Sequence, residues 1–108
     1  MKKFIELEER QKKKILNIIK DVKKESVIKL YDSIANIIDT IDNPVGLEII
    51  KKLPQYKPMY NVQTLFDILR EFSGNAYDVQ DDFIELRKYI GMEIDVFMIV
   101  NMMLDNYK

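Results

Sequence analysis

The segment at residues 94–104, IDVFMIVNMML, restricts the possible folds most strongly, because only Asp95 and Asn101 interrupt its apolar residues. Projected on a helical wheel, its apolar side chains point in almost every direction, and such a helix is normally buried all round. A membrane-spanning helix needs about 20 consecutive apolar residues, so this segment is too short to cross a bilayer. We therefore expect either a core helix wrapped by the rest of the chain or a helix covered on one side by a second molecule.

The rest of the sequence also has helical periodicity. Apolar residues recur at spacings of three and four, and Gly and Pro occur only three times each. The predicted fold is all-α: one small domain over residues 1–108, with five to six helices in an irregular or orthogonal bundle. Residues 1–41 are predicted to form one long, possibly kinked helix, and residues 44–106 the helical body.

The apolar stripe of the N-terminal region changes direction between Val22 and Val27, where a gap of five residues rotates it by about a quarter turn. One explanation is a single bent helix that changes the partner it faces, which is the interpretation we favour. The other is a break at KKES, with Ser26 capping a second helix. The second half of the stripe is the clearest in the chain, and it consists of Val27, Leu30, Tyr31, Ile34, Ile37, Ile38 and Ile41.

Start and stop signals divide the remaining residues into helices. Asn43 and Pro44 suit the N-cap and the first position of a short helix. Asp78 opens a later helix, and Gly91 ends it, since glycine readily adopts the left-handed conformation found after helix ends. The apolar segment then follows as the last predicted helix, over residues 93–106.

Composition excludes the commonest catalytic sites. The chain contains neither Cys nor His, so Ser–His and Cys–His catalysis and metal sites made of thiolate or imidazole are impossible within one chain. We predict no catalytic residue, no cofactor and no metal site, and hence a protein that is not an enzyme. The charged start FIELEERQKKK does not resemble a signal peptide, and the lack of Cys suits a reducing compartment, so a cytoplasmic location is expected. The Ile- and Lys-rich composition with few Arg is typical of a low-GC bacterium or its phage.

Acidic residues cluster in DVQDDFIE, where Asp78, Asp81, Asp82 and Glu85 recur at helical spacing. Such a face offers oxygen ligands to Mg²⁺ or Ca²⁺. Carboxylates at the start of a helix also complement its dipole and need no metal for that purpose. We favour a solvated acidic face over a metal site.

Charge is distributed unevenly along the chain. Residues 1–29 contain ten Lys and Arg against five Asp and Glu, whereas residues 30–108 contain seven against thirteen. A basic N-terminal helix can contact phosphates and bind nucleic acid without sequence specificity. This alternative function would use Arg10, Lys13, Lys14, Lys20 and Lys24. The interleaved Glu and Asp make a solvated, ion-paired helix face the better interpretation.

Residues 83–102 resemble a helix-turn-helix motif in their spacing, with Gly91 at the ninth position and apolar residues where the motif buries them. Their chemistry departs from the motif. Arg87 stands where the two helices need a small residue, and Glu93 and Asp95 in the would-be reading helix repel phosphate. We therefore expect at most a two-helix corner used for packing rather than for reading DNA.

The function that these observations favour is protein–protein binding by a regulatory or interaction protein. A homodimer is the simplest form, because most soluble oligomers are symmetric homo-oligomers. Met-rich apolar surfaces adapt to partners, and Tyr and Met are enriched at interfaces. The predicted interface residues are Ile94, Met98, Ile99, Met102 and Met103 of the apolar segment, with Tyr56 and Tyr60 of the loop YKPMYN.

Overall fold

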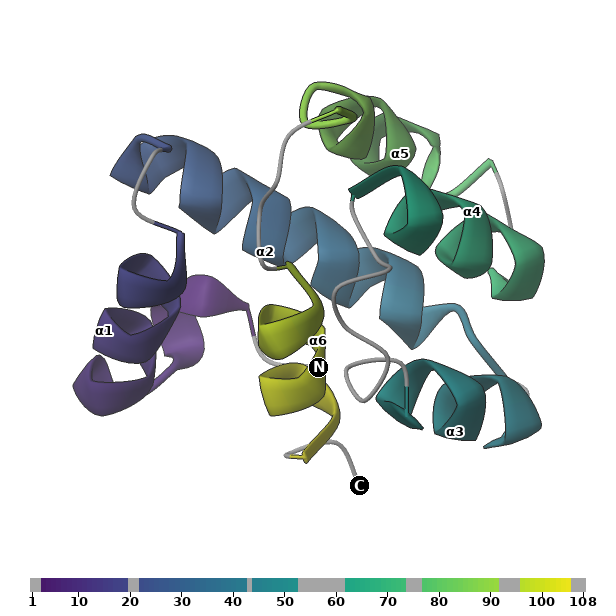
Figure 1. Cartoon of the computed structure of the whole chain (residues 1–108), viewed down its shortest axis with the longest axis horizontal. Coiled ribbons are helices and arrows are strands. Elements are labelled where there is room, and N and C mark those ends of the chain that lie inside the picture. The colour runs from purple at the N-terminus through teal and green to yellow at the C-terminus, as the bar shows by residue number, and fades with distance from the viewer. Residues whose placement is uncertain are drawn as a thin grey trace.

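A computed structural model describes residues 3–19, 22–42, 44–52, 62–73, 77–91 and 96–105 of the chain. Its elements in chain order are the 3₁₀ turn η1 (Phe4–Glu6) and the helices α1 (Glu9–Ile18), α2 (Lys24–Asp39), α3 (Pro44–Lys52), α4 (Val62–Phe72), α5 (Gln80–Arg87) and α6 (Val96–Asp105) (Figure 1). These residues include six α-helices and no strand, so the predicted all-α fold is confirmed. The helices form a nearly isometric globule with extents of 30 × 29 × 28 Å.

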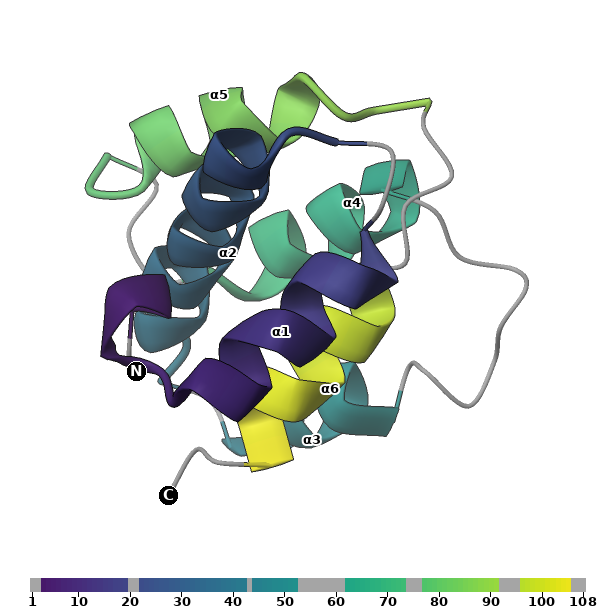
Figure 2. The ribbon, with the colours of Figure 1, turned by 90° about the vertical axis from the view of Figure 1, so that its left-hand side faces the viewer.

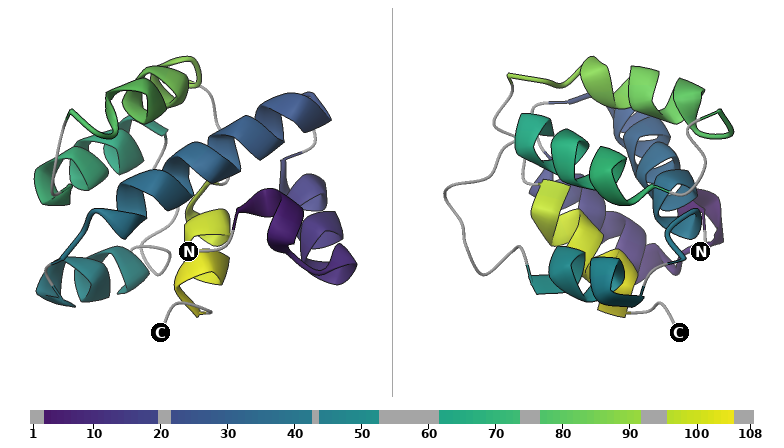
Figure 3. Two further views of the ribbon diagram at one scale, coloured as in Figure 1. Left: turned by 180° about the vertical axis from the view of Figure 1, so that it is seen from behind. Right: turned by 90° about the vertical axis from the view of Figure 1, so that its right-hand side faces the viewer.

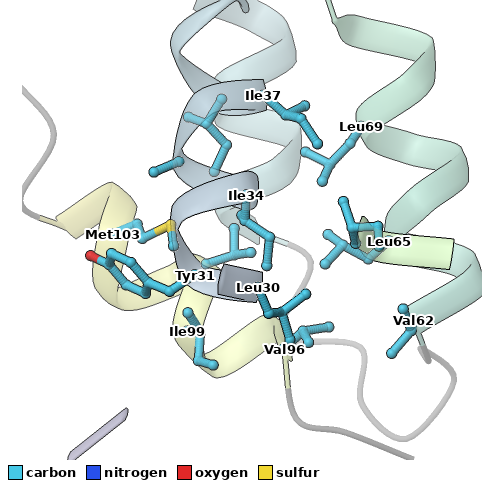
Figure 4. Close-up of a cluster of buried hydrophobic side chains, with 14 of the residues drawn as sticks. Leu30, Tyr31, Ile34, Ile37, Val62, Leu65, Leu69, Val96, Ile99 and Met103 are labelled. Atoms are coloured by element: carbon cyan, nitrogen blue, oxygen red, sulfur yellow. The ribbon is translucent and has the colours of Figure 1, made fainter. Parts of the chain in front are cut away.

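The long helix α2 crosses the molecule and carries the largest share of the core. All seven residues of its predicted apolar stripe are buried, which confirms that stripe. The helix α5 packs along α2, and α4 packs against α5 (Figure 1). In the interior, Leu30, Ile34 and Ile37 of α2 face Leu65 and Leu69 of α4 (Figure 4).

The prediction of one long helix over residues 1–41 is wrong. The helix α1 ends at Ile18, and Ile19 leaves the helical conformation with φ −111° and ψ 89°. Lys23 is extended, with φ −59° and ψ 146°, and α2 begins after it rather than at the expected cap Ser26. Both α1 and α2 contact α6, as Figures 1 and 2 illustrate. Because the helix is interrupted between α1 and α2, Ile15 and Val27 are both buried, although the apolar stripes to which they belong point in different directions.

The helix α6 lies at the centre of the bundle. It contacts α1, α2, α3 and α4, and Figure 2 shows α1 lying over it. Its five buried apolar residues are at most 4% exposed, and they are Val96, Ile99, Val100, Met103 and Leu104. For the side chains that the structure describes, the apolar segment is therefore a core helix wrapped by its own chain.

Several helix ends agree with the predicted signals. The helix α3 begins at Pro44, and Gly91 takes a positive φ of 92° after α5. The start of α5 differs, because its N-cap is Val79 rather than Asp78 and has no side-chain capping bond. Helical spacing from Val79, Phe83 and Leu86 predicts that Ile90 faces inward as they do, but Ile90 is 37% exposed. None of the described helices combines the length and the apolar content that crossing a membrane requires.

Candidate functional site

The predicted interface residues do not form one surface. Ile99 and Met103 are buried within the chain itself, against Tyr31 and its neighbours on α2 (Figure 4), so they are core residues and offer no surface to a partner. Met102 is half-buried. The other predicted interface positions lie outside the described side chains, and they are Ile94, Met98, Tyr56 and Tyr60.

A groove lies instead between η1, α1 and the first turns of α2, and we call it the basic groove. Its volume is about 400 Å³. It is lined by Phe4, Ile5, Glu9, Lys12, Lys13, Leu16, Lys24 and Ile28. The apolar members come from all three elements, and Ile5 is 80% exposed although it is a large hydrophobic residue. The groove therefore combines apolar surface with a border of three lysines.

Two contacts of Phe4 hold η1 against α2 and thereby create this groove. The Phe4 backbone N–H donates to Oδ1 of Asp32 at 2.8 Å. The Phe4 ring meets the ring of Tyr31 edge-on, with 5.8 Å between centroids and 77° between planes. Burial of the Tyr31 phenol, together with the nearby Asp32 carboxylate, raises the pKa of Tyr31 to about 12.

The basic groove has excess positive charge. Lys12 pairs with Glu9, with 3.4 Å between Nζ and Oε1, whereas Lys13 and Lys24 form no ion pair with a carboxylate of the described chain. The structure thus brings together two of the residues predicted for nucleic-acid binding. Arg10 and Lys14 are exposed elsewhere on α1 and do not line the groove, and Lys20 lies outside the described residues.

A second surface lies where α2 meets α5, on the side of α2 away from the basic groove, and we call it the acidic face. It contains Asp32 of α2 and Asp81, Asp82 and Glu85 of α5, with Lys29, Ser33 and Asn36 beside them. Asn36 Nδ2 donates to Oδ1 of Asp82 at 3.1 Å. Glu85, only 8% exposed, lies 2.7 Å from Nζ of Lys88, and this hydrogen bond raises the pKa of Lys88 above its usual value.

One of these contacts, between Asn36 and Asp82, joins α2 to α5, whereas the pair of Glu85 and Lys88 lies within the C-terminal turn of α5. Within the described ranges, no three acidic residues are grouped so that they could hold a metal ion. Asp81 is exposed and is available to a partner, whereas Asp82 is bonded to Asn36 of α2 and Glu85 is paired with Lys88 of its own helix.

The basic groove and the acidic face are neighbours. Lys24 and Ile28 of α2 line the groove, and Lys29 and Asp32, within the next two turns, line the acidic face. In the view from behind (Figure 3, left), α2 crosses the molecule with η1 on one side and α5 on the other. One exposed side of the protein therefore carries surfaces of opposite charge next to each other.

The helix-turn-helix-like spacing does not form a DNA-reading surface. The helix that would read DNA is α6, and four other helices pack around it. Ile90, which the motif would bury, is partly exposed. The burial of α6 agrees with the expectation that this segment serves packing rather than DNA reading, and residues 92–95, where the corner itself would lie, are outside the described residues.

The arrangement of the groove and the acidic face is suited to binding a charged, partly apolar surface. Comparison of the chain with protein-family models, curated proteins and solved structures gives no match.

Proposed function

We propose that this chain is a non-enzymatic, cytoplasmic protein that acts by binding protein, and that its first partner is a second copy of itself. The observation that carries the proposal is the position of the basic groove and the acidic face next to each other, on either side of α2 and on one exposed side of the protein. A two-fold axis through this side places each groove opposite the acidic face of the partner, which is the self-complementary arrangement of a symmetric dimer.

The size of the surface is consistent with this arrangement. A stable interface buries roughly 800 Å² on each partner, which is about one eighth of the 6809 Å² surface of this chain. The whole side from η1 to α5 is needed for such an area, rather than the groove alone. Ile5 and Ile28 supply apolar contact in the groove, and the surrounding charges set the orientation and the specificity.

A charge-reversal experiment tests the proposal. Lys24→Glu changes the groove and is compatible with folding, because a carboxylate in the first turn of α2 suits the helix dipole. Asp81→Lys changes the acidic face at an exposed position. By light scattering after gel filtration, the wild-type protein should have twice the 12.9 kDa chain mass. Each variant alone should be a monomer, because both of its contacts become repulsive.

Mixing the two variants should restore a dimer, since each groove then again faces an opposite charge. Lys14→Glu on α1 and Glu48→Lys on α3 are controls with the same charge changes at exposed positions outside the two surfaces, and both should remain dimeric. Rising salt should weaken the wild-type dimer, because exposed charges are screened.

Three results contradict the proposal. One is a wild-type protein that stays monomeric at high concentration and low salt. Another is a dimer that neither reversal affects. The third is salt-sensitive binding of nucleic acid in a gel-shift assay that Lys24→Glu and Lys14→Glu both weaken, which would support the nucleic-acid alternative instead.

A further inference from the structure

Two arginines from different helices meet at one aromatic ring, on the side of α5 that faces α4. Cζ of Arg70 in α4 lies 6.0 Å from the ring centre of Phe66 and 5.5 Å from that of Phe83. Cζ of Arg87 in α5 lies 5.8 Å from the same Phe66 ring. The two rings pack edge-to-face, with centroids 5.2 Å apart and planes at 72°. Both guanidinium groups therefore lie within 6.0 Å of the centre of the Phe66 ring.

The positive charge at this position is not neutralised. Neither Arg70 nor Arg87 forms an ion pair with an acidic residue in the described part of the chain. The carboxylates of Asp82 and Glu85 do not reach them, because they point to the opposite side of α5, toward α2 and Lys88. Contacts with aromatic rings attract a cation only weakly at exposed sites and do not neutralise its charge. An anion in contact with both guanidinium groups would neutralise it.

A pocket of about 230 Å³ adjoins the two guanidinium groups, and we call it the arginine pocket. Its lining consists of Arg70, Tyr77, Gln80, Phe83, Ile84 and Arg87. Positions 80, 84 and 87 share one face of α5 by helical spacing. Ile84 is 45% exposed, so apolar surface remains accessible beside the charged groups.

We propose that the arginine pocket binds a small ligand that carries a phosphate or carboxylate group on an aromatic or similar apolar body. Arginine presents a planar fork of N–H donors that matches two oxygens of such an anion. The oxyanion lies between Arg70 and Arg87, and the Gln80 amide is placed to donate to it. The apolar body packs on Ile84 and the edge of Phe83. This site lies on the opposite side of α5 from the acidic face, so the inference does not depend on the proposed dimer.

Isothermal titration with phenyl phosphate, benzoate, inorganic phosphate and benzyl alcohol tests the proposal in a buffer of physiological salt. Phenyl phosphate and benzoate should bind with saturation and more tightly than inorganic phosphate, which lacks the apolar body. Benzyl alcohol, which lacks the anion, should not bind measurably. Comparison of phenyl phosphate with benzoate shows which oxyanion the pocket prefers.

Arg87→Gln should weaken the binding of phenyl phosphate by about tenfold or more, as expected for losing a charge-assisted hydrogen bond. Arg87→Lys keeps the charge and the contact with the ring but lacks the fork, and it should weaken binding as well. Arg10→Gln makes the same change at an exposed position on α1 and serves as the matched control.

Two outcomes overturn the inference. One is the absence of saturable binding of phenyl phosphate and benzoate to the wild-type protein. The other is equal affinity of the Arg87→Gln and Arg10→Gln variants for phenyl phosphate, which would place the anion elsewhere. Thermal melting of each variant, with the wild-type transition retained, separates loss of binding from loss of folding.

Discussion

Truncation of Ile99 tests whether α6 is the core of the protein or part of a contact between molecules. Ile99 is completely buried in the cluster of Figure 4, and α6 packs against four other helices. Ile99→Ala removes three carbon atoms from this environment while keeping a residue that favours helix. We expect a large loss of stability and no change in the state of association.

The magnitude follows from the burial. At roughly 0.8 kcal/mol per buried methylene, loss of three carbons costs about 2.4 kcal/mol. If neighbouring side chains collapse only in part and leave a cavity of about 50 Å³, the cavity adds roughly 1.2 kcal/mol. The expected destabilisation is therefore about 3–4 kcal/mol, a large part of the roughly 5–15 kcal/mol that stabilises a domain of this size.

Urea unfolding followed by circular dichroism measures this quantity, with Ile49→Ala as the control. Ile49 lies on α3 and is 43% exposed, so its truncation should change stability by no more than about 0.5 kcal/mol. The reasoning is refuted if Ile99→Ala costs less than about 1 kcal/mol and at the same time converts a dimer into a monomer. That combination would place Ile99 at a contact between molecules.

Two further changes probe the packing around α2 and between α3 and α4. The pKa of Tyr31, raised from 10.0 to about 12, means that the folded state retains the phenol proton more strongly than the unfolded state. The resulting stabilisation, roughly 2–3 kcal/mol, is complete below pH 10 and is lost as the pH rises to 12. In urea unfolding at pH 9 to 11 the Tyr31→Phe variant should lack this loss of stability. If the pH dependence of its unfolding free energy equals that of the wild-type protein, Tyr31 is not the group responsible. A Cβ at Gly46 would lie 2.9 Å from Cδ1 of Phe72, so Gly46→Ala should destabilise by about 1 kcal/mol despite the better helix propensity of Ala. In a Phe72→Leu background the same change should stabilise, and equal effects in both backgrounds would rule out the clash.

Elements whose burial follows from local spacing could be predicted from the sequence. The predicted stripe puts six apolar residues on one face of α2 and Ile41 just beyond its end, and all seven are buried. Pro44 begins α3 and Gly91 follows α5 with positive φ, because each residue has a backbone preference that operates locally.

The break between α1 and α2 depends on distant parts of the chain, which is why the rotated stripe at Val22 to Val27 left both a bent helix and a break possible. No Gly or Pro occurs between Ile18 and Lys24, so no local signal stops the helix. The break occurs because both helices pack against α6, more than 70 residues later in the chain. Most helix stability comes from such tertiary packing, and it outweighs local propensity.

The candidate sites, like the helices, could be predicted from the sequence only in part. The basic character of Lys13 and Lys24 is visible in the sequence, but the groove between them exists because contacts of Phe4 with Asp32 and Tyr31 hold η1 against α2. The two arginines of the arginine pocket are 17 residues apart on separate helices, and the sequence contains no signal that they meet. The predicted interface through Ile99 failed because uniform hydrophobicity does not distinguish a core helix from a contact surface.

The central position of α6 has a consequence for how the chain folds during synthesis. Ribosomes add roughly 5–20 residues per second, so the 80 residues from Ile19 to Ile99 take about 4–16 s to make. Throughout that interval the stripe of α2 and the buried side of α1 lack the helix that both contact in the final structure. We expect the nascent chain to expose these apolar surfaces to chaperones for seconds. The cooperative core then closes only after residues 96–105 have left the ribosome.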